Sequence, residues 1–137
     1  MWWIYALLTA LFASLTAIFA KMGVTVVSSN LATAIRTIVI LLIAWSVVLV
    51  KGETKGLYTI SSQSLLFLVI SGITTGLSWL FYFKALQIGK VSQVAPVDKL
   101  SVALTIVLSV IFLNEALTIK TAIGALLIIA GTLVLIW

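Results

Sequence analysis

The sequence contains no cysteine and no histidine, and only three of its 137 residues are acidic. The absence of cysteine excludes disulfides and thiolate metal sites. Without histidine the chain also lacks the commonest metal ligand and the usual pH-sensitive side chain. Three carboxylates are too few for a metal cage or for the paired acids of a hydrolase. We therefore expect no metal site, no cofactor and no enzymatic activity.

Apolar residues fill most of what remains. They make up 64% of the chain, against about 45–50% in soluble domains, charged residues make up 8%, and the mean hydropathy is +1.36. A helix of roughly 20 apolar residues crosses a bilayer. Five stretches are long enough: Trp2–Ala20, Leu31–Val50, Ser64–Lys84, Val91–Leu113 and Ile119–Trp137. The sequence predicts an all-α integral membrane protein with five transmembrane helices in a single domain, residues 1–137, whose function lies between helices.

The positive charge and the N-terminus both fit this class. Met1–Ala20 has no positively charged start, and its apolar run fills the whole segment, so we expect a retained membrane helix rather than a signal peptide. The net charge of +5 is spread over helix ends and short loops. It therefore indicates anchoring at the lipid surface, with no nucleic-acid partner.

Short connections predict that successive helices pack antiparallel as neighbours. Lys51–Gln63, with two glycines, is expected to be a solvated turn, Asn30 to cap the second helix, and Gly89 to stop the third. Aromatic rings are expected at the membrane interfaces. They are Trp2, Trp3, Tyr58 and Trp137.

Small residues mark faces where membrane helices approach closely. Gly72 and Gly76 are four residues apart in the third helix, and Gly124 and Gly131 share a face of the fifth. One interpretation is ordinary contact within the protomer. The other is an interface between protomers. Because five helices enclose little buried volume, we favour this second interpretation for at least one stripe.

Two stripes of polar residues run along otherwise apolar helices. They are Ser71, Thr75, Ser78 and Tyr82 in the third helix, and Asp98, Ser101, Thr105 and Ser109 in the fourth. Such stripes face a bundle interior or a water-filled cavity, because lipid would leave them unsatisfied. Alternatively, serine and threonine hydroxyls bond back to carbonyls of their own helix and need no cavity.

Four charged residues lie inside the spans: Arg36, Lys84, Asp98 and Lys99. Because successive helices reverse direction, all four are expected in one half of the membrane, roughly 5–12 Å below its surface. Lys84 is expected to extend to the headgroups. Arg36 and Asp98 have similar depth and opposite charge, which predicts a buried pair, and Lys99 leaves an excess of positive charge.

Pro96 allows two interpretations of the fourth helix. If the helix begins at Pro96, the proline occupies a tolerated first-turn position and Asp98 faces the helix dipole as a structural residue. If it begins near Val91, Pro96 removes a backbone bond, kinks the helix and exposes a carbonyl beside Asp98. We favour the kinked helix lining a cavity.

The run APVDKLSVALTIVLSVIFLNEALTIKTAIGALLIIAGTLVLIW resembles the C-terminal half of the EamA-type transporters of the drug/metabolite transporter superfamily. The shared features are an early proline, a Phe-Leu-x-Glu at the helix end, a short turn and a glycine-punctuated last helix. AIRT (Ala34–Thr37) and GLSWLFYFKALQIGK (Gly76–Lys90) fit the same resemblance, which covers essentially the whole chain. Asn114 stands where the family usually has glycine, but asparagine also tolerates a left-handed cap.

The resemblance implies half of an inverted-repeat transporter fold, which two copies complete as a dimer. It implies alternating-access transport of a small polar metabolite, either amino acid-like or an organic anion. We place Trp79 and Tyr82 as aromatic walls, and Arg36 and Lys99 as partners of an anionic group. Asp98 then holds Arg36 or carries a coupling proton. The remaining pathway residues are Ser78, Ser101 and Thr105.

Two other functions stay open. Related short members suggest a non-catalytic membrane subunit or a component of a lipid-linked-sugar flippase. A small multidrug exporter is the weaker alternative, because those four-helix proteins use a glutamate in their first helix and Trp2–Ala20 carries no charge.

Lysine positions predict the orientation. Lys51, Lys55 and Lys120 fall on the side of the N-terminus and Lys21, Lys84 and Lys90 on the other. Adding the deeper Arg36 and Lys99 gives three against five, which would place the N-terminus outside. Orientation follows an excess of positive charge in short loops, and a balance this even predicts insertion both ways. We therefore expect an antiparallel homodimer surrounded by lipid. The alternative is one fixed orientation with a parallel or paralogous partner. The expected location of this multi-pass protein is the cell inner membrane or plasma membrane.

Overall fold

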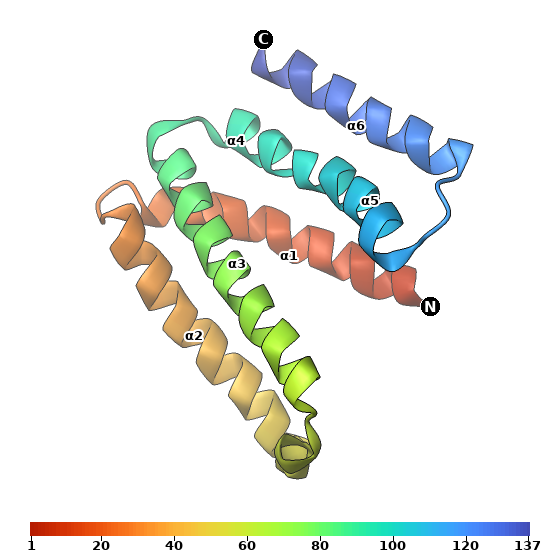
Figure 1. The fold of residues 1–137 in the computed structure, drawn as a ribbon. Helices are drawn as coiled ribbons and strands as arrows, with labels where there is room; N and C mark the ends of the chain where they lie inside the picture. The colour runs from red at the N-terminus through yellow and green to blue at the C-terminus, as the bar shows by residue number, and fades with distance from the viewer. The chain divides into compact units, whose positions relative to one another are not determined.

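The computed structural model describes residues 1–137, and its regular structure is entirely helical (Figure 1). The elements are α1 (Trp2–Gly23), α2 (Ser29–Val50), the 3-10 helix η1 (Glu53–Thr59), α3 (Ser62–Ile88), α4 (Val91–Asp98), α5 (Leu100–Leu113) and α6 (Ile119–Ile136). Five segments are long and apolar enough to cross a membrane, with α4 and α5 together forming one of them. The predicted all-α membrane fold with five spans is confirmed.

The chain divides into two compact units, residues 19–87 and residues 1–18 with 88–137. In the first unit, α2 and α3 run in opposite directions and η1 joins them (Figure 1). In the second, α6 packs along both α4 and α5. The assignment of residues 1–137 to a single domain stays a prediction.

The loop predictions around α2 need two corrections. The residue that caps α2 is Ser28, whose hydroxyl accepts a hydrogen bond from the Leu31 amide at 3.4 Å, so Asn30 lies inside the helix. Serine is as good a cap as asparagine, and the sequence offers both within three positions. The segment expected as a plain turn contains η1. Gly52, the residue before η1, has a left-handed backbone conformation (φ +67°).

The third helix continues past its predicted end. It stops at Ile88, and Gly89 follows as expected. The Lys21 ammonium donates a hydrogen bond to the Leu86 carbonyl at 2.5 Å, and a cation at this end also complements the helix dipole. Lys84 is exposed, as expected for a side chain that extends to headgroups, and its ammonium lies 3.4 Å from the Gln87 amide oxygen.

The fourth span begins at Val91 and is interrupted at Lys99, as expected if the helix starts near Val91 and Pro96 disturbs it. That this helix lines a cavity stays a prediction. At the break the Lys99 amide donates to the Pro96 carbonyl at 3.0 Å, a tighter 3-10 bond. The Thr132 hydroxyl on α6 donates to the same carbonyl at 3.2 Å. Asn114 ends α5 in the predicted left-handed conformation (φ 54°).

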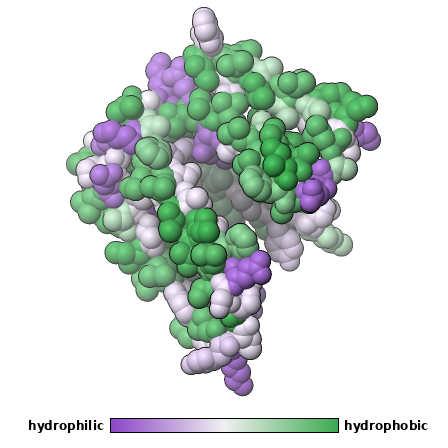
Figure 2. Space-filling model, in the orientation of Figure 1, coloured by the Kyte–Doolittle hydropathy of each residue, from purple (hydrophilic) through white to green (hydrophobic).

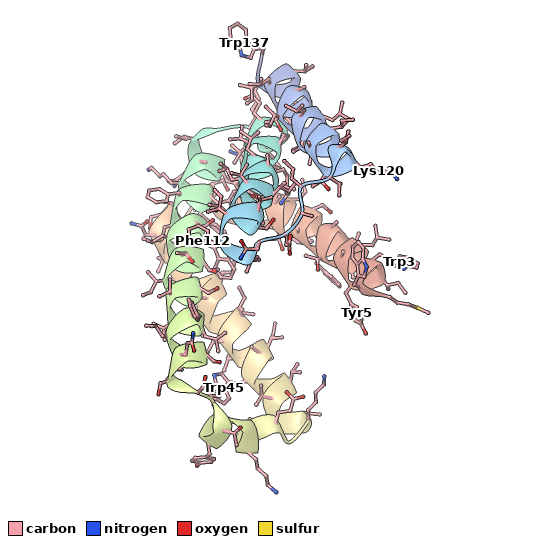
Figure 3. The ribbon with its side chains drawn as sticks, turned by 45° about the vertical axis from the view of Figure 1, so that its right-hand side comes forward. Trp3, Tyr5, Trp45, Phe112, Lys120 and Trp137 are labelled. Carbon is pink, nitrogen blue, oxygen red and sulfur yellow. The ribbon has the colours of Figure 1, made fainter.

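The outer surface suits a lipid environment. Apolar side chains cover most of the face seen in Figure 2. Trp3 and Tyr5 stand on the first turns of α1, and Lys120 and Trp137 mark opposite ends of α6 (Figure 3). Trp2, Tyr58 and Trp137 are also strongly exposed, as expected for rings at a membrane interface.

The predicted close-contact glycines meet no neighbouring helix of their own units. A Cβ atom added at Gly72, Gly76, Gly124 or Gly131 would have nothing within 4 Å. Gly124 and Gly131 therefore make no close helix contact with α4 or α5, although α6 packs along both. The interpretation of these two glycines as ordinary contacts within the protomer stays a prediction, beside that of an interface between protomers.

Candidate functional site

An arginine and two aromatic rings form a cluster between α2 and α3. The guanidinium carbon of Arg36 lies 4.4 Å from the centre of the Trp79 ring and 5.1 Å from the centre of the Phe83 ring. Trp79 and Phe83 are four residues apart on α3, so their side chains project from the same face. Arg36 sits on the least exposed face of α2, with Ser29 and Thr33.

The rings stabilise the charge without neutralising it. A guanidinium over an aromatic ring gains about 0.5–2 kcal/mol, more when water is excluded. Arg36 has no ion pair or hydrogen bond within its unit. The unit's one carboxylate, Glu53, belongs to η1 beyond the far end of α2, about 20 Å along the helix axis. A half-buried cation in a membrane segment therefore keeps its N–H donors available.

One of these two rings, Trp79, is a predicted site residue. Trp79 was expected as a wall, whereas Phe83 was missed, although its spacing from Trp79 placed it on the same face. Tyr82, the other expected wall, contacts Phe83 edge-on with ring centres 6.3 Å apart. Ser78, also predicted to line the pathway, is exposed.

Polar contacts fix the end of α3 beside the start of α2. The Gln87 amide donates to the carbonyls of Val24 and Val27, at 3.5 and 3.3 Å, in the loop that precedes α2. Beneath it, Phe83 and Leu86 are buried, with 2% and 0% of their surface exposed. The Phe83 ring, which faces Arg36, is thus held in place by the buried Leu86 and by the hydrogen bonds of Gln87.

The other predicted site residues lie in the second unit. Asp98 pairs with its neighbour Lys99, with Oδ2 and Nζ 3.1 Å apart, and both side chains are partly exposed. Asp98 and Arg36 belong to different units, so their pairing stays a prediction.

The Thr105 hydroxyl donates to the carbonyl of Ser101 at 2.8 Å, and Thr75 bonds to Ser71 in the same way at 2.7 Å. In both threonines the hydroxyl thus bonds to a carbonyl of its own helix, as in the second interpretation of the polar stripes.

Thr132 is a residue that sequence analysis missed. It is buried, with 4% of its surface exposed, and its hydroxyl connects α6 to the carbonyl at the break between α4 and α5. The hydroxyl also lies 2.8 Å from the Ile128 carbonyl. The signal available in the sequence was a single threonine beside Gly131 in an otherwise apolar stretch of the last helix.

Comparison with known proteins gives the family. The EamA-like transporter family matches residues 1–137. An uncharacterized transporter encoded in the cobO 3' region of Sinorhizobium sp. is 45% identical over 134 residues, which are 98% of this chain and 95% of that protein. An uncharacterized protein of Methanocaldococcus jannaschii is 35% identical over 81 residues, 59% of each chain. No solved structure matches the chain.

Proposed function

This chain belongs to the EamA-like transporter family and is a multi-pass membrane transporter, and on that premise we propose that it carries a small polar metabolite, amino acid-like or an organic anion. Transport proceeds by alternating access in an antiparallel dimer. The membrane is the bacterial inner membrane or plasma membrane, where lipid covers the apolar outer faces.

The observation that carries this proposal is the Arg36 guanidinium between helices. A cation inside a membrane segment is costly unless it serves a pathway or a ligand. Here aromatic rings hold the cation, and the one carboxylate of its unit, Glu53, lies about 20 Å away along the helix axis. An anionic or zwitterionic solute entering from water would supply the missing partner and would exchange its hydration for hydrogen bonds.

The other predicted pathway residues complete the proposed route. Trp79 and Tyr82 form the aromatic wall, and Ser78 continues it along α3. At the break at Lys99, the Pro96 carbonyl accepts hydrogen bonds from the Lys99 amide and the Thr132 hydroxyl, near the proposed coupling carboxylate, Asp98. In inverted-repeat transporters, such discontinuous helices contribute to the substrate and ion sites. Ser101 and Thr105 extend the pathway on α5.

An antiparallel pair would give two five-helix copies the internal two-fold symmetry of an inverted repeat. Lysines are balanced between the two predicted sides, so insertion has no strong bias. Gly124 and Gly131 leave a face of α6 on which a second copy can approach closely. A paralogous partner would occupy the same position if the chain inserted in one direction only.

The proposal is tested with purified protein and a panel of small metabolites. A solute that binds the folded state raises the unfolding temperature by mass action. The stabilising solute is then followed, in labelled form, into proteoliposomes that contain the protein. Uptake above empty liposomes is expected. Specific stabilisation without uptake would contradict transport and favour a binding or assembly subunit.

A further inference from the structure

We propose that Arg36 binds a single carboxylate group of the substrate through two N–H donors of its guanidinium, while Trp79 and Phe83 hold the guanidinium plane in position. This inference rests on the proposed function, because it names the chemical group that the same site recognises. It adds Phe83 as a residue that positions Arg36 and narrows the solute to a monocarboxylate, which includes amino acids.

The geometry favours two-point binding at the edge of the guanidinium. Arginine is planar and presents its donors in a rigid fork that matches a carboxylate. The guanidinium carbon lies over the Trp79 and Phe83 rings, 4.4 and 5.1 Å from their centres, and this contact uses none of the N–H donors in a conventional hydrogen bond. Burial of Phe83 and Leu86, together with the Gln87 hydrogen bond, limits rotation of the Phe83 side chain. A lysine ammonium would keep the charge but not the fork.

Charge balance favours a carboxylate over a phosphate. The cluster brings one positive charge, and the nearest lysines of the unit are already engaged, Lys21 with a carbonyl and Lys84 with the Gln87 side chain. One carboxylate neutralises one guanidinium. A phosphate with nearly two negative charges would leave a net charge in a medium of low dielectric, where that charge is costly.

Arg36 is the only arginine in the sequence, so its occupancy can be measured directly. Phenylglyoxal modifies arginine side chains, and the mass of the intact purified protein reports the extent of reaction. The probes are acetate, lactate and benzoate, each compared with its own amide at equal ionic strength, together with inorganic phosphate. Because only protein without bound ligand reacts, the rate of arginine modification should fall about threefold when the carboxylate concentration is twice its Kd.

Arg36→Lys gives the background reaction, and Asp98→Asn tests whether Asp98 covers Arg36. Protection by at least one carboxylate, with none from its amide and less from phosphate, is the expected result. Three results would overturn the inference: amides protect as well as carboxylates, phosphate protects as well, or Arg36 reacts faster in Asp98→Asn while carboxylates have no effect on the wild type. The last result would assign Arg36 to an ion pair with Asp98.

The failure of this inference can be separated from failure of the transport proposal. Protection of Arg36 from phenylglyoxal without solute flux in proteoliposomes would support carboxylate binding and contradict the transport proposal. Flux of a solute without protection of Arg36 would support transport and remove the carboxylate assignment.

Discussion

The guanidinium of Arg36 lies over the ring of Trp79, 4.4 Å from its centre, so one helix supplies the charge and its antiparallel neighbour supplies the surface that supports it. Phe83 adds a second ring one turn further along α3. The arrangement stabilises a cation in an apolar segment and leaves its hydrogen-bond donors for a solute.

Trp79→Leu should lower both stability and solute affinity, because leucine keeps apolar volume but removes the ring under the guanidinium. The free energy of unfolding should fall by about 1–2 kcal/mol, the value of a partly desolvated cation–π contact. Trp79→Phe, which keeps an aromatic face, should recover most of the loss. The measurements are denaturant unfolding in detergent micelles and the ligand-induced thermal shift.

Trp45→Leu is the matched control for this experiment. Trp45 is exposed on the other helix of the same unit, toward its far end (Figure 3). This variant should keep full solute affinity. Equal loss of affinity in Trp45→Leu and Trp79→Leu would mean that Trp79 acts only through general packing.

Asp98→Asn should be mild. Asp98 and Lys99 form a partly exposed pair, and such pairs contribute about 0–1 kcal/mol. If Arg36 and Asp98 act separately, the changes in the free energy of unfolding caused by Arg36→Gln and by Asp98→Asn should add in the double variant. A loss of about 3–5 kcal/mol in each single variant, relieved in the double variant, would instead identify the buried Arg36–Asp98 pair expected from the sequence.

Much of the fold follows from local chemistry that the sequence displays. Apolar runs predict the five spans, Pro96 predicts the break before α5, and Asn114 predicts the left-handed helix end. The cap of α2 and the 3-10 helix η1 were not predicted. At both places the sequence offers several residues of similar local preference, and tertiary contacts decide between them.

Thr132→Val should reduce stability because it removes the hydroxyl that donates to the Pro96 carbonyl. Hydrogen bonds between membrane helices average about 0.6 kcal/mol and reach about 1.7 kcal/mol, so a loss in this range is expected. Thr105→Val is the control, since its hydroxyl bonds within its own helix. The free energy of unfolding in micelles reports both, and equal losses would show that Thr132 does not join α6 to the break.

Insertion in both directions can be tested by single cysteines, because the chain has none of its own. A cysteine at Thr54 or Ser61, in the segment joining α2 to α3, should be labelled by an impermeant reagent from both sides of the membrane. Addition of lysines to this segment should then bias labelling to one side. Labelling of the original chain from one side only would exclude the antiparallel homodimer and leave a parallel or paralogous pair.

The candidate site was only partly predictable. The sequence identified Arg36 and Trp79, because an arginine and a tryptophan are conspicuous in apolar helices. Phe83 and Thr132 resemble ordinary membrane residues. Only the contact of Phe83 with Arg36 and the hydrogen bond of Thr132 to the Pro96 carbonyl distinguish them. Depth and charge sign predict Asp98 as the partner of Arg36, and this pairing stays a prediction because the two residues belong to different units. The contact of Asp98 with its neighbour Lys99 was not predicted.

The central claim is that solute crosses the membrane through a site at Arg36. The most direct measurement is exchange of labelled solute, the one that stabilises the purified protein, in proteoliposomes with wild type, Arg36→Lys and Lys84→Gln. Wild type and Lys84→Gln, which removes a charge from the exposed side of α3, should exchange at similar rates. Arg36→Lys should exchange at least about tenfold more slowly, the effect of losing about 1.4 kcal/mol of binding. Equal exchange by Arg36→Lys and wild type would contradict the account.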